Sequence, residues 1–250
     1  MSSYTYFAGF YDALTGNVGY DKKARYLLEL FKRHNHEPGL TLDLACGTGS
    51  LTLELSRCGV DIFGVDASSD MLSIAQQKFC DDERQTIFIC QKMQALELYS
   101  TINTCICTLD SINHLPSRKA VTDTFRRISS YLEEDGLFVF DCNTIYKHRH
   151  ILGDNCYIYD MEQVFCAWQN NYFEKDNKVI VTLDFFEPCG KKYTRYTEQF
   201  AERAYSREEM TTMLSEAGLY PEAVYDDMSF EAPGPESQRE IYVVRKKKHE

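Results

Sequence analysis

The sequence lacks an apolar run long enough to cross a bilayer, a secretory leader pattern and any excess of basic residues. Its 250 residues include 27 Lys and Arg against 38 Asp and Glu, which gives a formal net charge of -11. Because an acidic surface repels phosphate backbones, we expect neither a nucleic-acid partner nor a membrane partner. A cytoplasmic location is the simplest expectation.

Cysteine pairs and metal-binding clusters are also missing. The 10 cysteines are scattered without a Cys-x-x-Cys pair, which is typical of buried thiols in a reducing compartment and not of a disulfide framework. The six histidines include His34, His36, His148 and His150 in polar stretches, where solvated side chains are the simpler explanation. We therefore expect no metal centre.

The residues that are present indicate a globular protein. Hydrophobic residues make up 44% of the chain and aromatic residues 13%, which is enough to bury a core. A chain of this length can form one large domain or one domain with a substantial insertion. The basic run at residues 246–248 is expected to be a solvated tail.

One stretch, residues 41–71, organises the chain. An apolar segment ends at Leu44 and leads into a glycine-rich turn at residues 45–50, and the helical pattern that follows closes at Gly59. A second apolar segment stops at Asp66. This carboxylate stands about 20 residues beyond the glycines, where a Rossmann unit binds the ribose of a nucleotide.

The loop itself disfavours a dinucleotide. Dinucleotide loops carry three glycines that let a pyrophosphate approach a helix N-terminus. Here the glycines are Gly47 and Gly49, the third position holds Thr52, and Asp43 stands beside the loop. A carboxylate repels a pyrophosphate and attracts a cation. A ligand with an adenosine and an ammonium group fits better, so a nicotinamide-dependent oxidoreductase is the weaker hypothesis.

Residues 43–50 and 64–72 together resemble the first two motifs of the class I S-adenosylmethionine-dependent methyltransferases. The resemblance implies that S-adenosyl-L-methionine is the cofactor, that the glycine loop lies under its methionine part, and that Asp66 binds the ribose while Met71 covers the adenine. The alternative is a Rossmann-like unit for another nucleotide. The predicted cofactor contacts are Tyr11, Tyr20, Asp43, Ala45, Cys46, Gly47, Gly49, Asp66, Ala67, Met71, Gln91, Met93 and Leu109.

One position departs from the resembled family. Its members usually carry an acidic residue where this chain has Lys92, and a lysine cannot accept a hydrogen bond from the adenine amino group. We expect Gln91 or a backbone group to replace that contact, with Met93 packing on the ring. The same departure leaves open a non-catalytic cofactor-binding protein that kept the fold.

An aromatic segment at residues 4–20 precedes the glycine loop. It resembles the N-terminal segment that folds over the cofactor in small-molecule methyltransferases, which implies that Tyr11 and Tyr20 contact the cofactor or the acceptor. Packing of an N-terminal helix on the sheet explains the same tyrosines equally well.

Candidate catalytic residues follow the strand expected at residues 103–109. Ligands of open α/β sheets bind beyond the carboxyl ends of the strands, near the reversal of strand order. This rule places Asp110 and His114 near the sulfonium, as general-base candidates. The alternative makes Asp110 a helix cap and His114 a surface residue. An Asn-Pro-Pro-Tyr motif and a Pro-Cys nucleophile are both missing here, which argues against methylation of nucleic-acid bases.

The segment after the fifth expected strand, which we place at residues 137–141, changes character. Three strand-like runs at residues 164–172, 179–186 and 193–204 are separated by turn-rich stretches. An antiparallel meander at this place should form a lid over the acceptor site. The predicted acceptor contacts are Tyr146, Trp168 and Arg195.

The expected fold is α/β, with a Rossmann-like seven-stranded mostly parallel sheet that has an antiparallel last hairpin, plus the inserted antiparallel β lid. Residues 1–150 and 206–250 would form the core and residues 151–205 the lid. The expected reaction is direct in-line transfer of the methyl group to an N, O or C nucleophile of a small-molecule methyl acceptor. Methylation of tRNA or protein is the alternative. A homodimer is compatible with the sequence, which does not establish the oligomeric state.

Overall fold

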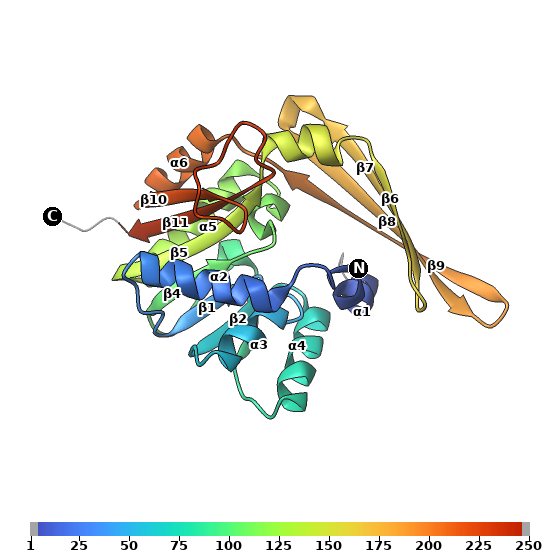
Figure 1. Cartoon of the computed structure of the whole chain (residues 1–250), viewed down its shortest axis with the longest axis horizontal. Coiled ribbons are helices and arrows are strands. Elements are labelled where there is room, and N and C mark those ends of the chain that lie inside the picture. The colour runs from blue at the N-terminus through green and yellow to red at the C-terminus, as the bar shows by residue number, and fades with distance from the viewer. Residues whose placement is uncertain (1–4, 247–250) are drawn as a thin grey trace.

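Two separate β-sheets organise the computed structural model, which describes residues 5–246 (Figure 1). Tyr4, Lys247 and Lys248 of the segments discussed above lie outside the described residues. The larger sheet has the strand order β10-β11-β5-β4-β1-β2-β3. Its strands are β1 (Thr41–Leu44), β2 (Ile62–Asp66), β3 (Phe88–Cys90), β4 (Ile102–Cys107), β5 (Leu132–Asn143), β10 (Leu219–Asp226) and β11 (Arg239–Lys246).

The pairing of these strands confirms the expected topology. The strands from β3 to β5 pair in parallel, β11 runs antiparallel to β5, and β10 runs antiparallel to β11. Strand order reverses at β1, because the chain moves outward to β3 on one side and then returns to β4 on the other. The crevice at the carboxyl ends of β1 and β4 is therefore where a ligand is expected.

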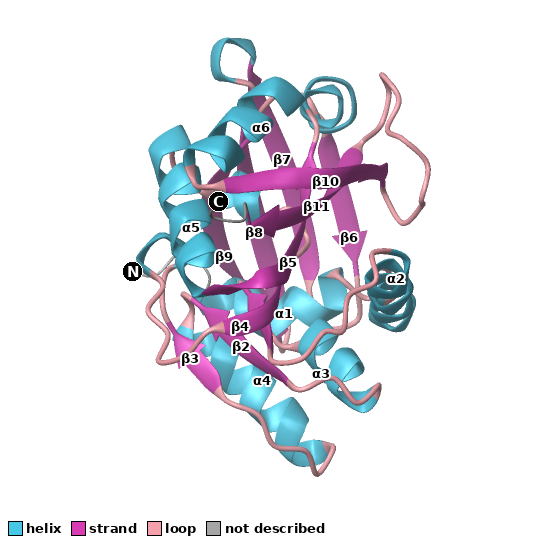
Figure 2. Ribbon diagram, turned by 90° about the vertical axis from the view of Figure 1, so that its left-hand side faces the viewer, coloured by secondary structure: helices cyan, strands magenta, loops and turns pink. Residues whose placement is uncertain are grey.

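Helices cover both faces of the larger sheet, as Figure 2 shows. One face packs on α2 (Tyr20–Arg33) and α3 (Ser50–Arg57), and the opposite face packs on α5 (Arg118–Tyr131) and α6 (Arg207–Glu216). A helix on each face explains why the central strands are apolar on both sides. The helix α6 begins with a capping box between Ser206 and Glu209.

The smaller sheet is an antiparallel meander that projects beside the core in Figure 1. It consists of β6 (Cys156–Asp160), β7 (Phe165–Phe173), β8 (Lys178–Cys189) and β9 (Lys192–Arg203). We call the face that carries Val181, Leu183 and Phe185 its inner face, because these side chains are fully buried. They form one cluster with Ala8 of α1 (Thr5–Leu14) and Met71 of α4 (Ser69–Asp81). The sheet is thus fixed against the helices that flank the glycine loop.

Four local features differ from the expectation. The strand β6, with the sequence CYIYD, was not expected, although four of its five residues are hydrophobic, and its residues are alternately exposed and half-buried. The strand β5 begins at Leu132 and not at residue 137, since an acidic run that resembles a turn continues the strand. A π-helix at Lys147–Leu152 had no recognisable pattern. The apolar run at residues 86–90 predicts a short buried strand, but the edge strand β3 that it forms is partly exposed.

No helix within residues 5–246 has the length and apolar content that crossing a membrane requires.

One buried amide joins the two sheets. The side chain of Asn113, which follows β4, donates to the carbonyls of Asn143 on β5 and Arg203 on β9, and accepts from the backbone N–H of Asn143.

We expect Asn113→Ala to lower the free energy of unfolding by about 3 kcal/mol, because it leaves three buried backbone groups without this partner. Urea denaturation measures this loss. The matched control is Asn171→Ala, at an exposed position of β7, and should change stability by less than about 0.5 kcal/mol. Equal stability of both variants would contradict the proposed role of Asn113.

Candidate functional site

The glycine loop bends sharply between β1 and α3. Ala45, Gly47 and Gly49 all have positive φ angles, a conformation that glycine adopts without strain. At Gly49 a side chain is also excluded by space, because a Cβ there would lie 2.8 Å from the Cβ of Ala75 on α4. The loop is therefore packed closely against α4, and its residues Ala45, Cys46, Thr48 and Ser50 lie at the crevice beyond the carboxyl end of β1.

Asp66 at the end of β2 braces this loop. Its carboxylate accepts the backbone N–H of Gly47 at 2.9 Å and that of Ser68 at 2.8 Å. Burial raises the pKa of Asp66 above its ordinary value, although these N–H bonds oppose the shift. The carboxylate thus lies beside the loop, as the expected ribose-binding role requires.

A cavity of ≈ 320 Å³, counted with its open mouth, lies between the glycine loop and the end of β4. Among the described residues that line it, one is a carboxylate and none is a lysine or arginine. The predicted contacts that line it are Tyr11, Tyr20, Asp43, Ala45, Cys46 and Leu109, and the residues not predicted are Thr48, Ser50, Leu51, Thr108 and Ser111. This charge pattern suits a cationic ligand better than a pyrophosphate.

Asp43 lies at the floor of this cavity and is almost fully buried. The hydroxyl of Thr52 donates to its Oδ2 at 2.6 Å. Thr52 occupies the third glycine position of dinucleotide loops, so the substitution that we noted in the sequence also supplies the partner of Asp43. Burial raises the pKa of Asp43 to about 7, although the hydrogen bond from Thr52 opposes the shift.

The other predicted cofactor contacts do not line this cavity. They are Gly47, Gly49, Asp66, Ala67, Met71, Gln91 and Met93. Both ends of the Gln91 amide are bonded to the backbone of Glu97, so this side chain would have to give up two hydrogen bonds to reach an adenine. Lys92 is exposed. The adenine contacts therefore stay predictions, and Gln91 is the weakest of them.

The two acceptor contacts that were predicted on the smaller sheet lie on opposite faces of it. Trp168 pairs with Leu183 on the inner face. Arg195 pairs with Phe186 on the opposite face and binds Asp184 there through two hydrogen bonds. The prediction for Arg195 is therefore wrong, because the alternation of a strand points its side chain away from the core. Tyr146 begins the π-helix and packs on the ring of His150.

Two consecutive left-handed residues, Leu109 and Asp110, form the turn after β4. Their backbone N–H groups both donate to the carboxylate of Asp141 on β5, at 3.1 and 2.7 Å. Such a backbone is costly for residues other than glycine unless its surroundings hold it. Asp110 does precede a short helix, but its side chain makes no capping bond, so the helix-cap alternative does not explain it.

A network of buried ion pairs stabilises this turn. Arg239, the first residue of β11, binds Asp141 and Asp110 at 2.5 Å each, and Lys23 of α2 binds Asp141 at 3.0 Å. Burial opposes ionisation of Asp141, but these two cations lower its pKa to about 2. Arg239 likewise holds the pKa of Asp110 well below its ordinary value despite burial. Sequence reasoning missed Arg239, because 129 positions separate it from Asp110.

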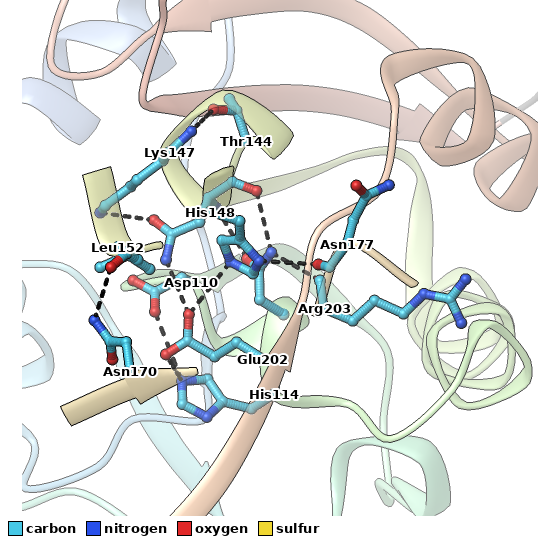
Figure 3. A network of polar contacts seen from close by, with 12 residues as sticks. Asp110, His114, Thr144, Lys147, His148, Leu152, Asn170, Asn177, Glu202 and Arg203 are labelled. Carbon is cyan, nitrogen blue, oxygen red and sulfur yellow. Dashed lines mark hydrogen bonds and ion pairs between the residues drawn. The ribbon is translucent and has the colours of Figure 1, made fainter. Parts of the chain in front are cut away.

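The two candidate bases meet a third residue that was not predicted. His114 Nε2 lies 3.6 Å from Asp110 Oδ2 and 3.8 Å from Glu202 Oε1 of β9 (Figure 3). Burial opposes protonation of His114, but the two carboxylates outweigh it and raise its pKa above the ordinary value. The surface alternative for His114 is therefore wrong, since only about a quarter of its side chain is exposed.

Glu202 comes from the inner face of the smaller sheet, where it pairs with the buried Val179. Its Oε2 accepts from the Asn143 amide at 3.2 Å and lies 3.5 Å from the buried Nε2 of His148. The core and the smaller sheet thus each supply a carboxylate to one imidazole. No metal centre was expected, yet Asp110, His114 and Glu202 place one ligand atom each within 4.8 Å of one another.

Residues 41–136 match the family model described as a methyltransferase domain. Over its full length the chain is similar to the Geobacillus sp. protein GWCH70_2453, provisionally named a methyltransferase, at 32% identity with 98% of this chain and 100% of the relative covered. Among solved structures it is similar to an S-adenosylmethionine-dependent methyltransferase from Clostridium acetobutylicum, at 32% identity and a TM-score of 0.88, with 98% and 99% of the two chains covered.

A more distant solved structure has the ligand in place. CalS10 from Micromonospora echinaspora, an amino pentose methyltransferase solved with S-adenosylmethionine bound, is 16% identical with a TM-score of 0.74. The match covers 94% of this chain and 96% of CalS10. At this identity the likeness shows a shared fold.

The ion pairs of Arg239 predict a measurable loss of stability. We expect Arg239→Met to lower the free energy of unfolding at pH 7 by about 3 kcal/mol, because two buried carboxylates lose their shared partner. Urea denaturation measures this change. The control is Arg25→Met, whose ion pair with Asp21 is exposed and should contribute less than about 1 kcal/mol. If both variants lost equally little, the ion pairs would not be what holds the turn.

Proposed function

Because this chain belongs to the class I S-adenosylmethionine-dependent methyltransferases, we propose that it methylates a small molecule held between the Asp110 turn and the smaller sheet. Its cofactor is S-adenosylmethionine. The cofactor supplies, when bound, a methyl group on a sulfonium that is already a good leaving group. The protein therefore has to position the acceptor and exclude water, which can contribute about 7–11 kcal/mol to lowering the barrier.

The residues of the cavity fit this cofactor. Asp43 provides a buried carboxylate for the ammonium of the methionine part, and the glycine loop lines the cavity through Ala45, Cys46, Thr48 and Ser50. Asp66 stands beside the loop for the ribose hydroxyls. The pyrophosphate of a dinucleotide would be repelled by the carboxylate of Asp43 in this cavity, and Thr52 stands where a third glycine would let it approach the helix.

Proton transfer from the acceptor falls to His114. A general base contributes roughly 100- to 10,000-fold when the acceptor must lose a proton before or during attack. Asp110 and Glu202 face the imidazole and stabilise its protonated form. Arg239 holds the pKa of Asp110 well below its ordinary value, so Asp110 is a weak proton acceptor and acts as the partner of His114.

Two observations support a small acceptor. The inner face of the smaller sheet carries Glu202 to the turn after β4, which limits the room left for a macromolecule. CalS10, which shares the fold, acts on an amino pentose. Methylation of tRNA or protein remains the second candidate, and the net charge of -11 disfavours the first of these substrates.

Labelled methyl transfer tests the proposal. The protein is incubated with methyl-tritiated S-adenosylmethionine and with either the low-mass filtrate or the retained macromolecules of a bacterial extract. We expect label in the filtrate fraction only, and little label with Asp66→Ala, which removes the carboxylate beside the loop. The control is Asp61→Ala, an exposed position at the opposite end of the same strand. Label in protein or RNA would overturn the proposal.

The raised pKa of Asp43 predicts a pH dependence of cofactor binding. Below pH 7 the Asp43 carboxyl is protonated in the free protein, so binding of an ammonium must release its proton. We therefore expect the affinity for S-adenosylhomocysteine to rise up to about tenfold per pH unit from pH 5 to 7 and to level off above pH 7. Calorimetry in buffers of different ionisation enthalpy measures the released proton. Asp43→Asn should bind more weakly and without this dependence, whereas a flat profile for the wild type would contradict the role of Asp43.

A further inference from the structure

Two carboxylates of different origin direct one oxygen each toward His114. Asp110 uses Oδ1 for Arg239, and Glu202 uses Oε2 for the Asn143 amide. Their second oxygens, Asp110 Oδ2 and Glu202 Oε1, face Nε2 of His114. Each carboxylate is therefore anchored to the core through one oxygen and presents the other to the same point.

The spacing of the three atoms would let one ligand atom approach all of them. The separations of 3.6 and 3.8 Å from Nε2 are longer than the roughly 2.7–2.9 Å of a charge-assisted hydrogen bond. All three atoms nevertheless lie within 4.8 Å of one another. They can share one donor placed among them.

Hydrogen-bond chemistry selects the class of that donor. A carboxylate only accepts hydrogen bonds, and an imidazole that acts as a base must accept as well. A hydroxyl has one hydrogen and can donate a hydrogen bond to one of these three acceptors. A carbon nucleophile can donate to none of them. A primary or secondary amine, which arrives as an ammonium, carries two or three N–H groups and can serve two or three.

A metal ion fits the same atoms less well. Arg239 already binds Asp110, and Lys147, bonded to Asn143, adds a second positive charge nearby. A dication would be repelled by both cations.

We propose that the methyl acceptor is a small-molecule amine, and that Glu202 of the smaller sheet and Asp110 of the core hold its nitrogen against His114. This inference rests on the proposed function and assigns Glu202 as the residue that recognises the acceptor. The ammonium gives one proton to Nε2 of His114, and the freed lone pair forms the new C–N bond while the S–C bond breaks. The electron pair of that bond stays on sulfur, which becomes a neutral thioether, and the methylated amine carries the positive charge.

Sinefungin tests the site without knowledge of the natural acceptor. In this analogue of S-adenosylmethionine, a carbon that bears an amine replaces the sulfur that bears the methyl group, so its ammonium stands where the transferable methyl would be. Calorimetry on the wild type should show sinefungin binding about tenfold or more tightly than S-adenosylhomocysteine, because its ammonium, about 3–3.5 Å from the place of the acceptor nitrogen, is attracted by the two carboxylates.

Two matched variants assign the effect to Glu202. We expect Glu202→Gln to weaken sinefungin about tenfold while S-adenosylhomocysteine stays within about twofold of the wild type. Glu198→Gln alters a carboxyl on the same strand and the same buried face, four positions away, and should change neither affinity. Thermal unfolding of both variants checks that they fold. The comparison of sinefungin with S-adenosylhomocysteine on the wild type does not depend on either variant.

Several outcomes would overturn the inference. Equal affinity of the wild type for both ligands would do so, as would an unchanged preference for sinefungin in Glu202→Gln, or equal weakening of both ligands by that substitution. Binding of Mn²⁺ that requires Glu202 and competes with sinefungin would mean that the site takes a metal ion and not an amine. Failure of the wild type to bind S-adenosylhomocysteine would instead overturn the proposed function itself.

Discussion

The geometry of the site depends on one buried carboxylate, that of Asp141 on β5. It accepts the backbone N–H groups of Leu109 and Asp110 and binds Arg239 and Lys23. A left-handed pair of residues other than glycine is costly in isolation, and here it is held by two hydrogen bonds to an anion. That anion is stable in the interior only because two cations, brought by α2 and β11, compensate its burial. The turn after β4 therefore depends on elements from both ends of the chain.

The smaller sheet contributes to the same site through polar contacts as well as through burial. Its inner face packs on α1 and α4, which fixes the sheet beside the cofactor cavity. The amide of Asn113 then joins β5 to β9, and this junction sets where Glu202 meets His114. An insertion that the sequence presents as a lid is thus also a source of site chemistry. Because the carboxylates of Asp110 and Glu202 belong to different sheets, small shifts of the smaller sheet would change the distance between them.

In the cavity beside the glycine loop, the residue at position 52 bears on which ligand is expected. A third glycine would let a pyrophosphate approach the helix, whereas Thr52 gives Asp43 a hydrogen-bond partner and keeps a carboxylate in the floor of the cavity. The cost of burying that carboxylate shows in its raised pKa. A cationic group of a ligand lowers this cost, since it stabilises the charged form. The same residue pair therefore disfavours a dinucleotide and favours a ligand that carries an ammonium.

The sequence by itself determined the parallel sheet, the glycine loop, Asp66 and the positions of Asp110 and His114, because these features rest on local periodicity and on the short spacing of two motifs. It did not reveal β6, whose pattern is exposed and alternating, nor the true start of β5. It misplaced Arg195, since the face of a strand depends on register, and register is set by pairing with β8. Only the tertiary structure brought Arg239 and Glu202 to the turn after β4, because ion pairs between distant elements leave no periodic trace in a single sequence.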